Sequence, residues 1–219
     1  MKSVLISIRP EWCELIANGK KTIEVRKTVP TLEKPFKVYI YCTKSMTHLY
    51  ESKDQTAKEV LGAYYTTQHN KTSLVPSGFL NGKVIGEFVC NNVSYISASI
   101  DADGDRHLQN TAFLERRMCL TDDELFKYLY KGKGKDNAGY AWHISNLVMY
   151  KGMPRELSEF RTPDWYRDCE KQCPDLERMR CPVKDSRKAD KVCGWCRRGG
   201  KSITRPPQSW CYVEALKGE

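Results

Sequence analysis

The chain contains several short stretches in which apolar and polar residues alternate, and no regular succession of helices separates them. These stretches are rich in Val, Ile, Tyr, Phe and Thr, the residues that half-buried β-strands favour. They predict strands at residues 2–8, 21–27, 37–42, 83–93, 139–150 and 209–213. Because strands and helices do not alternate in βαβ order, the fold class expected is α+β with a mainly antiparallel sheet.

Three segments have the spacing of amphipathic helices instead. Residues 11–18 carry apolar side chains on one face, and Gly19 follows as a C-terminal cap. Residues 54–65 have helical spacing of their apolar residues, and residues 121–130 open with Thr-Asp-Asp-Glu, the sequence of a capping box. We expect these helices to flank the sheet.

The charge is unevenly distributed. The chain has 36 Lys and Arg against 27 Asp and Glu, a net charge of +9, and residues 165–205 hold 12 of the basic and 6 of the acidic residues. Such a surplus suits a polyanionic partner. Residues 1–10 lack a long apolar segment and no later run is long enough to span a membrane, so we expect a cytoplasmic protein without membrane contact.

A cluster of ionic residues follows the first predicted helix. Residues 19–26 read Gly-Lys-Lys-Thr-Ile-Glu-Val-Arg and fit the pattern G-x-K-x-x-E-x-R. Because side chains repeat every two residues along a strand, Glu24 and Arg26 share a face, and Lys21 stands at the junction just before them. The three could hold a phosphate or the edge of a base. The alternative is an exposed strand with ordinary ion pairs.

On this signature the chain resembles the ASCH family, a branch of the PUA-like proteins. The similarity of layout includes a later strand at 86–89 and the segment 142–144, and extends over residues 1–160 and 204–214. The resemblance implies a PUA-like, mainly antiparallel β-barrel with flanking helices and a cleft beside it. It also implies recognition of RNA or of a modified nucleoside or nucleotide.

Three functions follow as hypotheses. The first is binding of RNA or a modified nucleotide, with contacts from Lys20, Lys21, Glu24, Arg26, Trp142, Arg197 and Arg198. Trp12 and Trp210 are further candidates for stacking on a base, and core packing is the alternative for all three tryptophans. The third hypothesis is a protein-interaction module that meets an acidic partner.

The second hypothesis is that the chain is an amidohydrolase of a modified nucleoside, or a ribonuclease, that uses the same cleft. It is implied by the family resemblance, since some similar proteins are hydrolases. The catalytic residues would be Lys21 and Glu24. Lys21 would activate or hold the nucleophile, Thr22 or a water molecule would attack, and Glu24 or Glu87 would transfer the proton.

Five of the ten cysteines lie within 28 residues near the C-terminus. They are Cys169, Cys173, Cys181, Cys193 and Cys196. Two closely spaced pairs of thiols suit tetrahedral Zn²⁺, and a segment with so few apolar residues needs a metal in order to fold. We therefore expect a structural zinc ion held by four of these five cysteines. Unligated thiols in a basic loop are the alternative.

The change in composition near residue 164 divides the chain into three parts. Residues 1–163 are expected to form the barrel, residues 164–203 a small, basic, metal-stabilised insert, and residues 204–219 the final barrel strand and tail.

Overall fold

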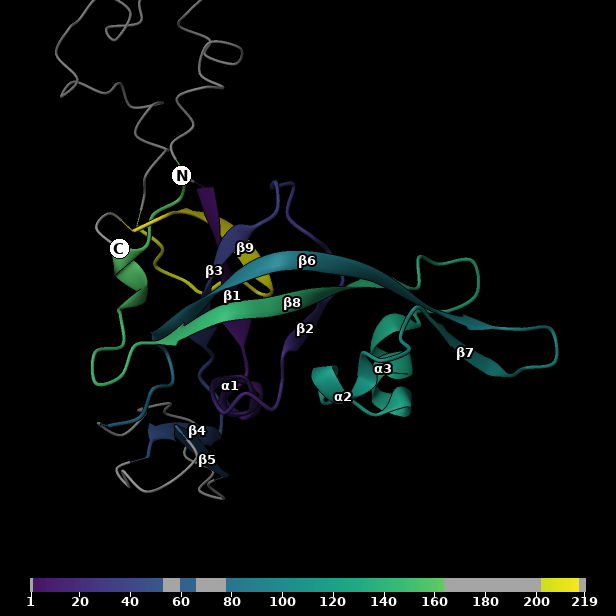
Figure 1. Cartoon of the computed structure of the whole chain (residues 1–219), viewed down its shortest axis with the longest axis horizontal. Helices are drawn as coiled ribbons and strands as arrows, with labels where there is room; N and C mark the ends of the chain where they lie inside the picture. Colours follow the sequence, from purple (N-terminus) through teal and green to yellow (C-terminus); the bar gives the residue numbers. More distant parts are fainter. Residues whose placement is uncertain (1, 53–59, 66–77, 164–201, 217–219) are drawn as a thin grey trace, which may run out of the picture.

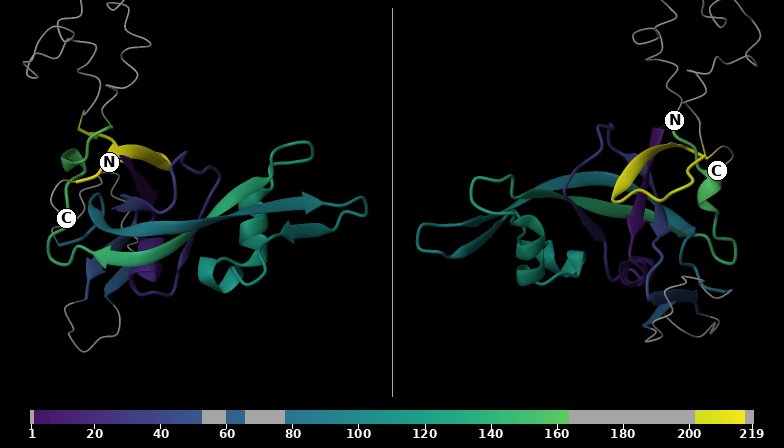
Figure 2. Two further views of the ribbon diagram at one scale, coloured as in Figure 1. Left: turned by 45° about the horizontal axis from the view of Figure 1, so that its top comes forward. Right: turned by 180° about the vertical axis from the view of Figure 1, so that it is seen from behind.

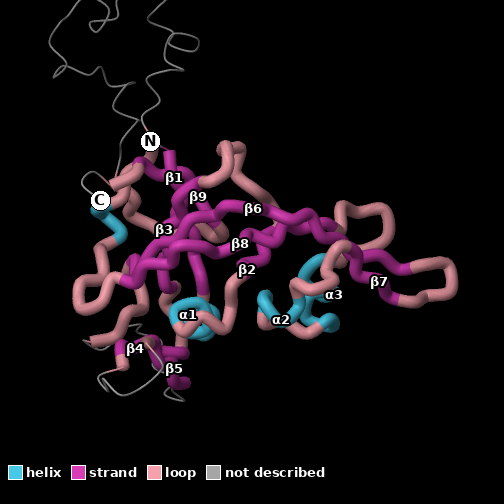
Figure 3. The backbone as a smooth tube through the Cα atoms, in the orientation of Figure 1, coloured by secondary structure: helices cyan, strands magenta, loops and turns pink. Residues whose placement is uncertain are grey.

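A computed structural model describes residues 2–52, 60–65, 78–163 and 202–216. Most of this structure is β-strand, with short helices packed around it (Figures 1 and 3). The elements are β1 (Lys2–Ile8), α1 (Pro10–Ala17), β2 (Ile23–Arg26), β3 (Phe36–Cys42), β4 (Thr47–Glu51), β5 (Leu61–Tyr65), β6 (Val84–Ile100), β7 (Arg106–Gln109), α2 (Glu115–Met118), α3 (Asp122–Leu129), β8 (Ala138–Met149), η1 (Leu157–Glu159) and β9 (Trp210–Glu214).

Seven strands form one twisted sheet in the order β2-β8-β6-β3-β1-β9, and β7 pairs with the far end of β6. The pair β1–β3 is parallel, and the other pairs of this sheet are antiparallel. β4 and β5 form a separate hairpin beside α1. The mixed α+β class expected from the sequence is therefore correct.

The expectation of a closed barrel is wrong. Within the described residues the sheet is open, because β2 pairs with β8 alone and β9 pairs with β1 alone. The last residues of β1 bond to the segment before β9 and not to β2: the N–H of Ser7 donates to the Ser209 carbonyl at 2.9 Å. The two outer strands thus stay apart at one end of the sheet.

Three apolar clusters hold the layers together. The largest lies between the sheet and α1 with the β4–β5 hairpin, and includes Ile6, Ile16 and Phe88. The second joins β2, β6 and β8 to α2 and α3, which lie under the extended end of the sheet (Figures 1 and 2). The third covers the opposite face of β1 and β3 around Tyr39 and Phe160.

The elements agree with the sequence patterns in most places. The helix expected at 121–130 is α3, and its capping box is present: the Glu124 N–H donates to Thr121 Oγ1, and the Thr121 N–H donates to the Glu124 carboxylate. The helix expected at 54–65 is wrong for residues 61–65, which form β5. Pairing with β4 buries Leu61 and overrides the helical spacing there. Residues 53–59 lie outside the described part.

Among the described residues, none of the helices has the length and apolar character needed to cross a bilayer.

Candidate functional site

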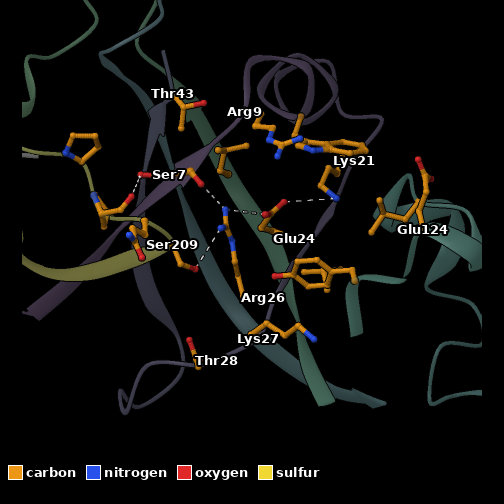
Figure 4. A pocket seen from close by; sticks show the side chains of 18 residues that line it. Ser7, Arg9, Lys21, Glu24, Arg26, Lys27, Thr28, Thr43, Glu124 and Ser209 are labelled. Atoms are coloured by element: carbon orange, nitrogen blue, oxygen red, sulfur yellow. Dashed lines mark hydrogen bonds and ion pairs between the residues drawn. The ribbon is translucent and has the colours of Figure 1, made fainter. Parts of the chain in front are cut away.

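The sharp turn after α1 positions Lys21. Gly19 has φ of +71°, a value that glycine adopts without strain, and the N–H groups of Lys20 and Lys21 both donate to the Leu15 carbonyl at 2.9 Å. The chain then enters β2, where Glu24 and Arg26 point to one face as period-two alternation requires. Figure 4 shows Glu24 between Lys21 and Arg26.

The Glu24 carboxylate contacts both cations, and Lys21 and Glu24 are buried. Glu24 Oε1 lies 3.0 Å from Arg26 Nη2, and Glu24 Oε2 lies 3.6 Å from Lys21 Nζ. The exposed fraction is 3% for Lys21 and 6% for Glu24. The structure therefore brings together the three residues that the signature predicted to converge, and we refer to Lys21, Glu24 and Arg26 as the ionic triad.

A backbone carbonyl and an aromatic ring stabilise the buried ammonium group of Lys21. Its Nζ donates to the Met118 carbonyl at 2.5 Å and lies 5.0 Å from the centre of the Trp12 ring. Burial lowers the pKa of Lys21, and the nearby Glu24 carboxylate raises it in part. The result is an amine that gives up its proton more readily than an exposed lysine does.

Arg26 reaches across the open end of the sheet. Its Nη2 donates to the Ser7 carbonyl at the end of β1 at 2.6 Å, and its Nη1 donates to Ser209 Oγ at 3.4 Å. Its buried Nε has no hydrogen-bond partner among the described residues. The guanidinium thus spans the gap that the sheet leaves between β2 and β1, with one donor unused.

A cavity of about 990 Å³ opens over the ionic triad (Figure 4). Its walls come from β1, α1, β2, α3 and residues 206–209. Four cationic side chains line it, Arg9, Lys21, Arg26 and Lys27, against the two carboxylates of Glu24 and Glu124, which leaves a formal surplus of two positive charges. Trp12 and Tyr128 supply aromatic surface in the same lining. The cavity thus offers cationic, acceptor and aromatic groups together.

Other predicted contacts lie elsewhere. Lys20 is exposed and does not line the cavity. Trp142 is fully buried in the core, where it packs edge-on against Phe36 at 5.7 Å between ring centres. A side chain without exposed surface cannot stack on a base, so the expectation for Trp142 is corrected to core packing. Trp210 is half-buried and donates to Thr28 Oγ1 at 2.9 Å.

Two groups named for a hydrolase also lie outside the cavity lining. Thr22 Oγ1 accepts a hydrogen bond from Arg117 Nε at 3.1 Å. Glu87 accepts from Lys37 Nζ at 2.7 Å and from the Tyr150 hydroxyl at 2.6 Å. Neither residue lines the cavity, so Thr22 as nucleophile and Glu87 as proton carrier do not fit this geometry.

Sequence reasoning missed several residues of the lining. Arg9, Lys27 and Tyr128 come from a helix start, a strand end and a distant helix, and nothing in their local patterns distinguishes them. For residues 206–209 the sequence offers one indication of a special role, the Pro-Pro pair before the last strand. Ser7 Oγ donates to the Pro207 carbonyl at 2.7 Å and fixes this segment beside β1.

The predicted metal ligands and two predicted phosphate contacts lie outside the described residues. They are Cys169, Cys173, Cys181, Cys193, Cys196, Arg197 and Arg198. In the part of the chain that the structure describes, no three His, Cys, Asp or Glu side chains are grouped so that they could hold a metal ion.

The comparisons with known proteins agree with the resemblance seen in the sequence. The family model described as ASCH domain matches residues 6–150. The crystal structure of ASCH from Zymomonas mobilis is similar, with a TM-score of 0.47 and 14% identity over 97% of this chain and 87% of that chain. A mutant of the Zymomonas mobilis protein gives a TM-score of 0.43 and 16% identity over 72% of this chain and 77% of that one. No curated protein matches the chain.

Proposed function

Because this chain belongs to the ASCH domain family, we propose that it binds RNA or a modified nucleoside or nucleotide in the cavity over the ionic triad. The observation that carries the proposal is the buried arrangement of a carboxylate between two cations on the floor of a cavity that also exposes aromatic surface. Arg26 and Lys21 carry N–H donors beside the Glu24 carboxylate, which retains acceptor capacity. Adjacent donors and acceptors of this kind suit the polar edge of a nucleobase.

Aromatic and cationic groups extend this complementarity. Trp12 and Tyr128 offer faces on which a base can stack, and stacking tolerates any base. The positive surplus of the lining favours a ligand that carries phosphate. An uncharged, purely apolar ligand would displace water from the polar groups of the lining without supplying hydrogen bonds in its place.

The test measures ligand binding by two variants, Tyr128→Ala and Arg9→Ala. Both residues line the cavity and are exposed, Tyr128 to 41%, so their replacement should not disturb the core. We expect Tyr128→Ala to weaken binding of a short RNA by about 1–3 kcal/mol, or roughly 5- to 150-fold. Calorimetry with the four ribonucleoside monophosphates and fluorescence anisotropy with a labelled hexaribonucleotide provide the readouts.

Two matched variants control for nonspecific loss. Tyr95→Ala removes an exposed tyrosine outside the cavity, and Arg116→Ala removes an exposed arginine outside it. Both should bind as the wild type does. If all four variants bind equally, or if the wild type binds neither RNA nor nucleotide, the proposal fails.

A second candidate function is hydrolysis of a modified nucleoside or of RNA in the same cavity. The lowered pKa of Lys21 favours it, because a buried amine beside a carboxylate can accept a proton from a water molecule. The binding samples decide between the two functions. A binder returns the ligand intact, whereas a hydrolase releases acetate or a cleavage product, at a rate that rises with pH through the pKa of Lys21 and is lost in Lys21→Met.

We also propose that four of the five clustered cysteines bind a structural zinc ion. The support is their spacing in the sequence. The zinc ion would stabilise the fold and would not take part in a reaction, since four thiolates leave the metal no open position for a substrate.

A further inference from the structure

A loop with three lysines begins directly after α3, whose last residue, Leu129, contacts Lys27 of the cavity lining. It joins α3 to β8 and carries Lys131, Lys133 and Lys135, all exposed, against the single carboxylate of Asp136. In Figure 1 this connection arches outward from the end of the extended sheet. Its Gly-Lys-Gly core differs from a nucleotide-binding P-loop, because a helix precedes it and a strand follows it. We call residues 131–135 the lysine loop.

The lysine loop has a defined conformation. The Lys131 N–H donates to Asn137 Oδ1 at 2.7 Å, and Asn137 Nδ2 donates to the Gly132 carbonyl at 3.1 Å. The Asn137 carbonyl in turn accepts from the Ala98 N–H of β6 at 3.0 Å, which ties the loop to the sheet. Gly132 and Gly134 have φ of +125° and +73°, so their backbone conformation requires glycine. The three lysines therefore extend from a turn whose backbone is fixed by these hydrogen bonds.

Lys27 connects this loop to the cavity. It lines the cavity, donates from Nζ to the Leu129 carbonyl at 2.7 Å, and lies 5.1 Å from the centre of the Tyr128 ring. Leu129 is the last residue of α3, and Lys131 follows two residues later. Burial first, and then the positive charge of Lys131, lower the pKa of Lys27. Lys27 thus lies at the point where the chain leaves α3 and enters the lysine loop.

The nearby Asp136 carboxylate offsets the repulsion between Lys27 and Lys131 only in part. Across the described residues, none of the three lysines of the loop forms a salt bridge, whereas Lys127 on α3 pairs with Asp123 at 2.5 Å. A row of like charges without partners destabilises the free protein slightly, and a bound polyanion relieves it.

From this continuity we propose that the ligand is a single polynucleotide strand, with one nucleotide in the cavity and its neighbouring phosphates on the lysine loop. The inference rests on the proposed function and narrows its ligand from RNA, nucleosides or nucleotides to a single strand. A duplex is excluded as the direct ligand, because a paired base can enter the cavity only after it leaves the stack. The loop contacts phosphates and so does not itself read sequence.

The experiment compares strand and monomer on loop variants of the full chain. The triple variant Lys131→Ala, Lys133→Ala, Lys135→Ala should bind a hexaribonucleotide about tenfold or more weakly at low salt. Its plot of log affinity against log salt should be shallower by about 2, since each phosphate contact on a single strand contributes about 0.7 to the slope. Binding of ribonucleoside monophosphates should not change.

Two triple variants serve as controls. Replacing the same three lysines by arginine keeps the charge and should retain hexamer binding. Replacing Lys2, Lys34 and Lys151 by alanine removes three exposed lysines outside the cavity lining, and should leave both affinity and slope unchanged. A deoxyribose hexamer of the same sequence shows whether the sugar is recognised in addition to the phosphates.

The outcomes separate the two proposals. The wild type and the loop variant could bind the hexamer with the same affinity and the same salt slope while Tyr128→Ala still weakens binding. That result would overturn the role of the lysine loop but not the proposal that the cavity binds a nucleotide. A wild type that binds neither hexamer nor monophosphate would overturn both. Displacement of the hexamer by a hexaglutamate peptide at equal concentration would show that the loop serves an acidic protein instead.

Discussion

Lys21 is the residue on which the chemistry of the cavity most depends. A buried ammonium group is unfavourable unless its donors are satisfied. Here a carboxylate, a backbone carbonyl and the face of Trp12 surround it. This environment keeps a charge in the interior at a lowered pKa, which is the condition under which a lysine either orients an anionic ligand or exchanges a proton with it.

Lys21 should make stability depend on pH in the alkaline range. Its pKa in the folded state is below its value in the unfolded chain, so the unfolded state binds more protons between the two values. Wild-type stability should therefore rise, relative to Lys21→Met, as pH increases toward about 10.5. Denaturant unfolding of both proteins from pH 7 to 10.5 measures the difference.

The control is Lys151→Met, which removes an exposed lysine. Its stability curve should run parallel to that of the wild type. A constant difference between the wild type and Lys21→Met over the whole range would contradict the assigned shift.

At the scale of elements, α3 links the fold to the cavity. Its buried face, with Leu125 and Leu129, packs on the second apolar cluster, and its exposed face places Glu124 and Tyr128 in the cavity lining. The helix is only 8 residues long, so its start contributes a large part of its stability. The capping box at Thr121 therefore matters for the cavity as well as for the helix.

Thr121→Ala should lower the free energy of unfolding by about 0.5–2 kcal/mol, because it removes the side chain that accepts the Glu124 N–H. The effect should shrink in acid. Hydrogen bonds from Thr121 lower the pKa of Glu124, so the stability contributed by this carboxylate is present above its unfolded pKa and is lost as pH falls through its folded value. Thr121→Ser keeps the hydroxyl and should be close to wild type. Equal unfolding curves for the alanine variant and the wild type would show that the cap is unimportant.

At the scale of the whole molecule, the described residues on the two sides of the cysteine-rich segment pair with each other. Arg161 and Ser202 form an antiparallel bridge, and the Ile203 N–H donates to the Phe160 carbonyl at 2.8 Å. The chain therefore returns to nearly the same place after the segment. Ile203 and Val213 then complete the third apolar cluster.

This arrangement predicts that residues 164–201 can be replaced by a Gly-Ser linker of four residues. The thermal midpoint should be retained or rise, because a shorter loop has a smaller closure entropy. Elemental analysis should find about one zinc ion per full-length chain and none in the shortened chain. Cys119→Ser, which alters a cysteine of the described part, should keep its zinc. Zinc retained by the shortened chain, or missing from the full-length chain, would refute the assignment of the metal to these cysteines.

Local sequence patterns alone predicted six of the nine described strands, two of the three expected helices and the ionic triad, but not β4, β5 or β7. Each of these is encoded locally, by alternation along β2, by the glycine turn after α1 and by the capping box of α3. The spacing of Lys21, Glu24 and Arg26 therefore indicated their convergence before any contact between distant segments was known.

Only the tertiary structure decided which residues surround the triad and whether the sheet closes. β5 forms because β4 lies beside it, and Trp142 is buried against Phe36 and Trp210. Tyr128 and residues 206–209 reach the cavity from positions about 100 and 180 residues away from the triad. Such contacts depend on long-range packing and backbone pairing, which a local pattern does not contain.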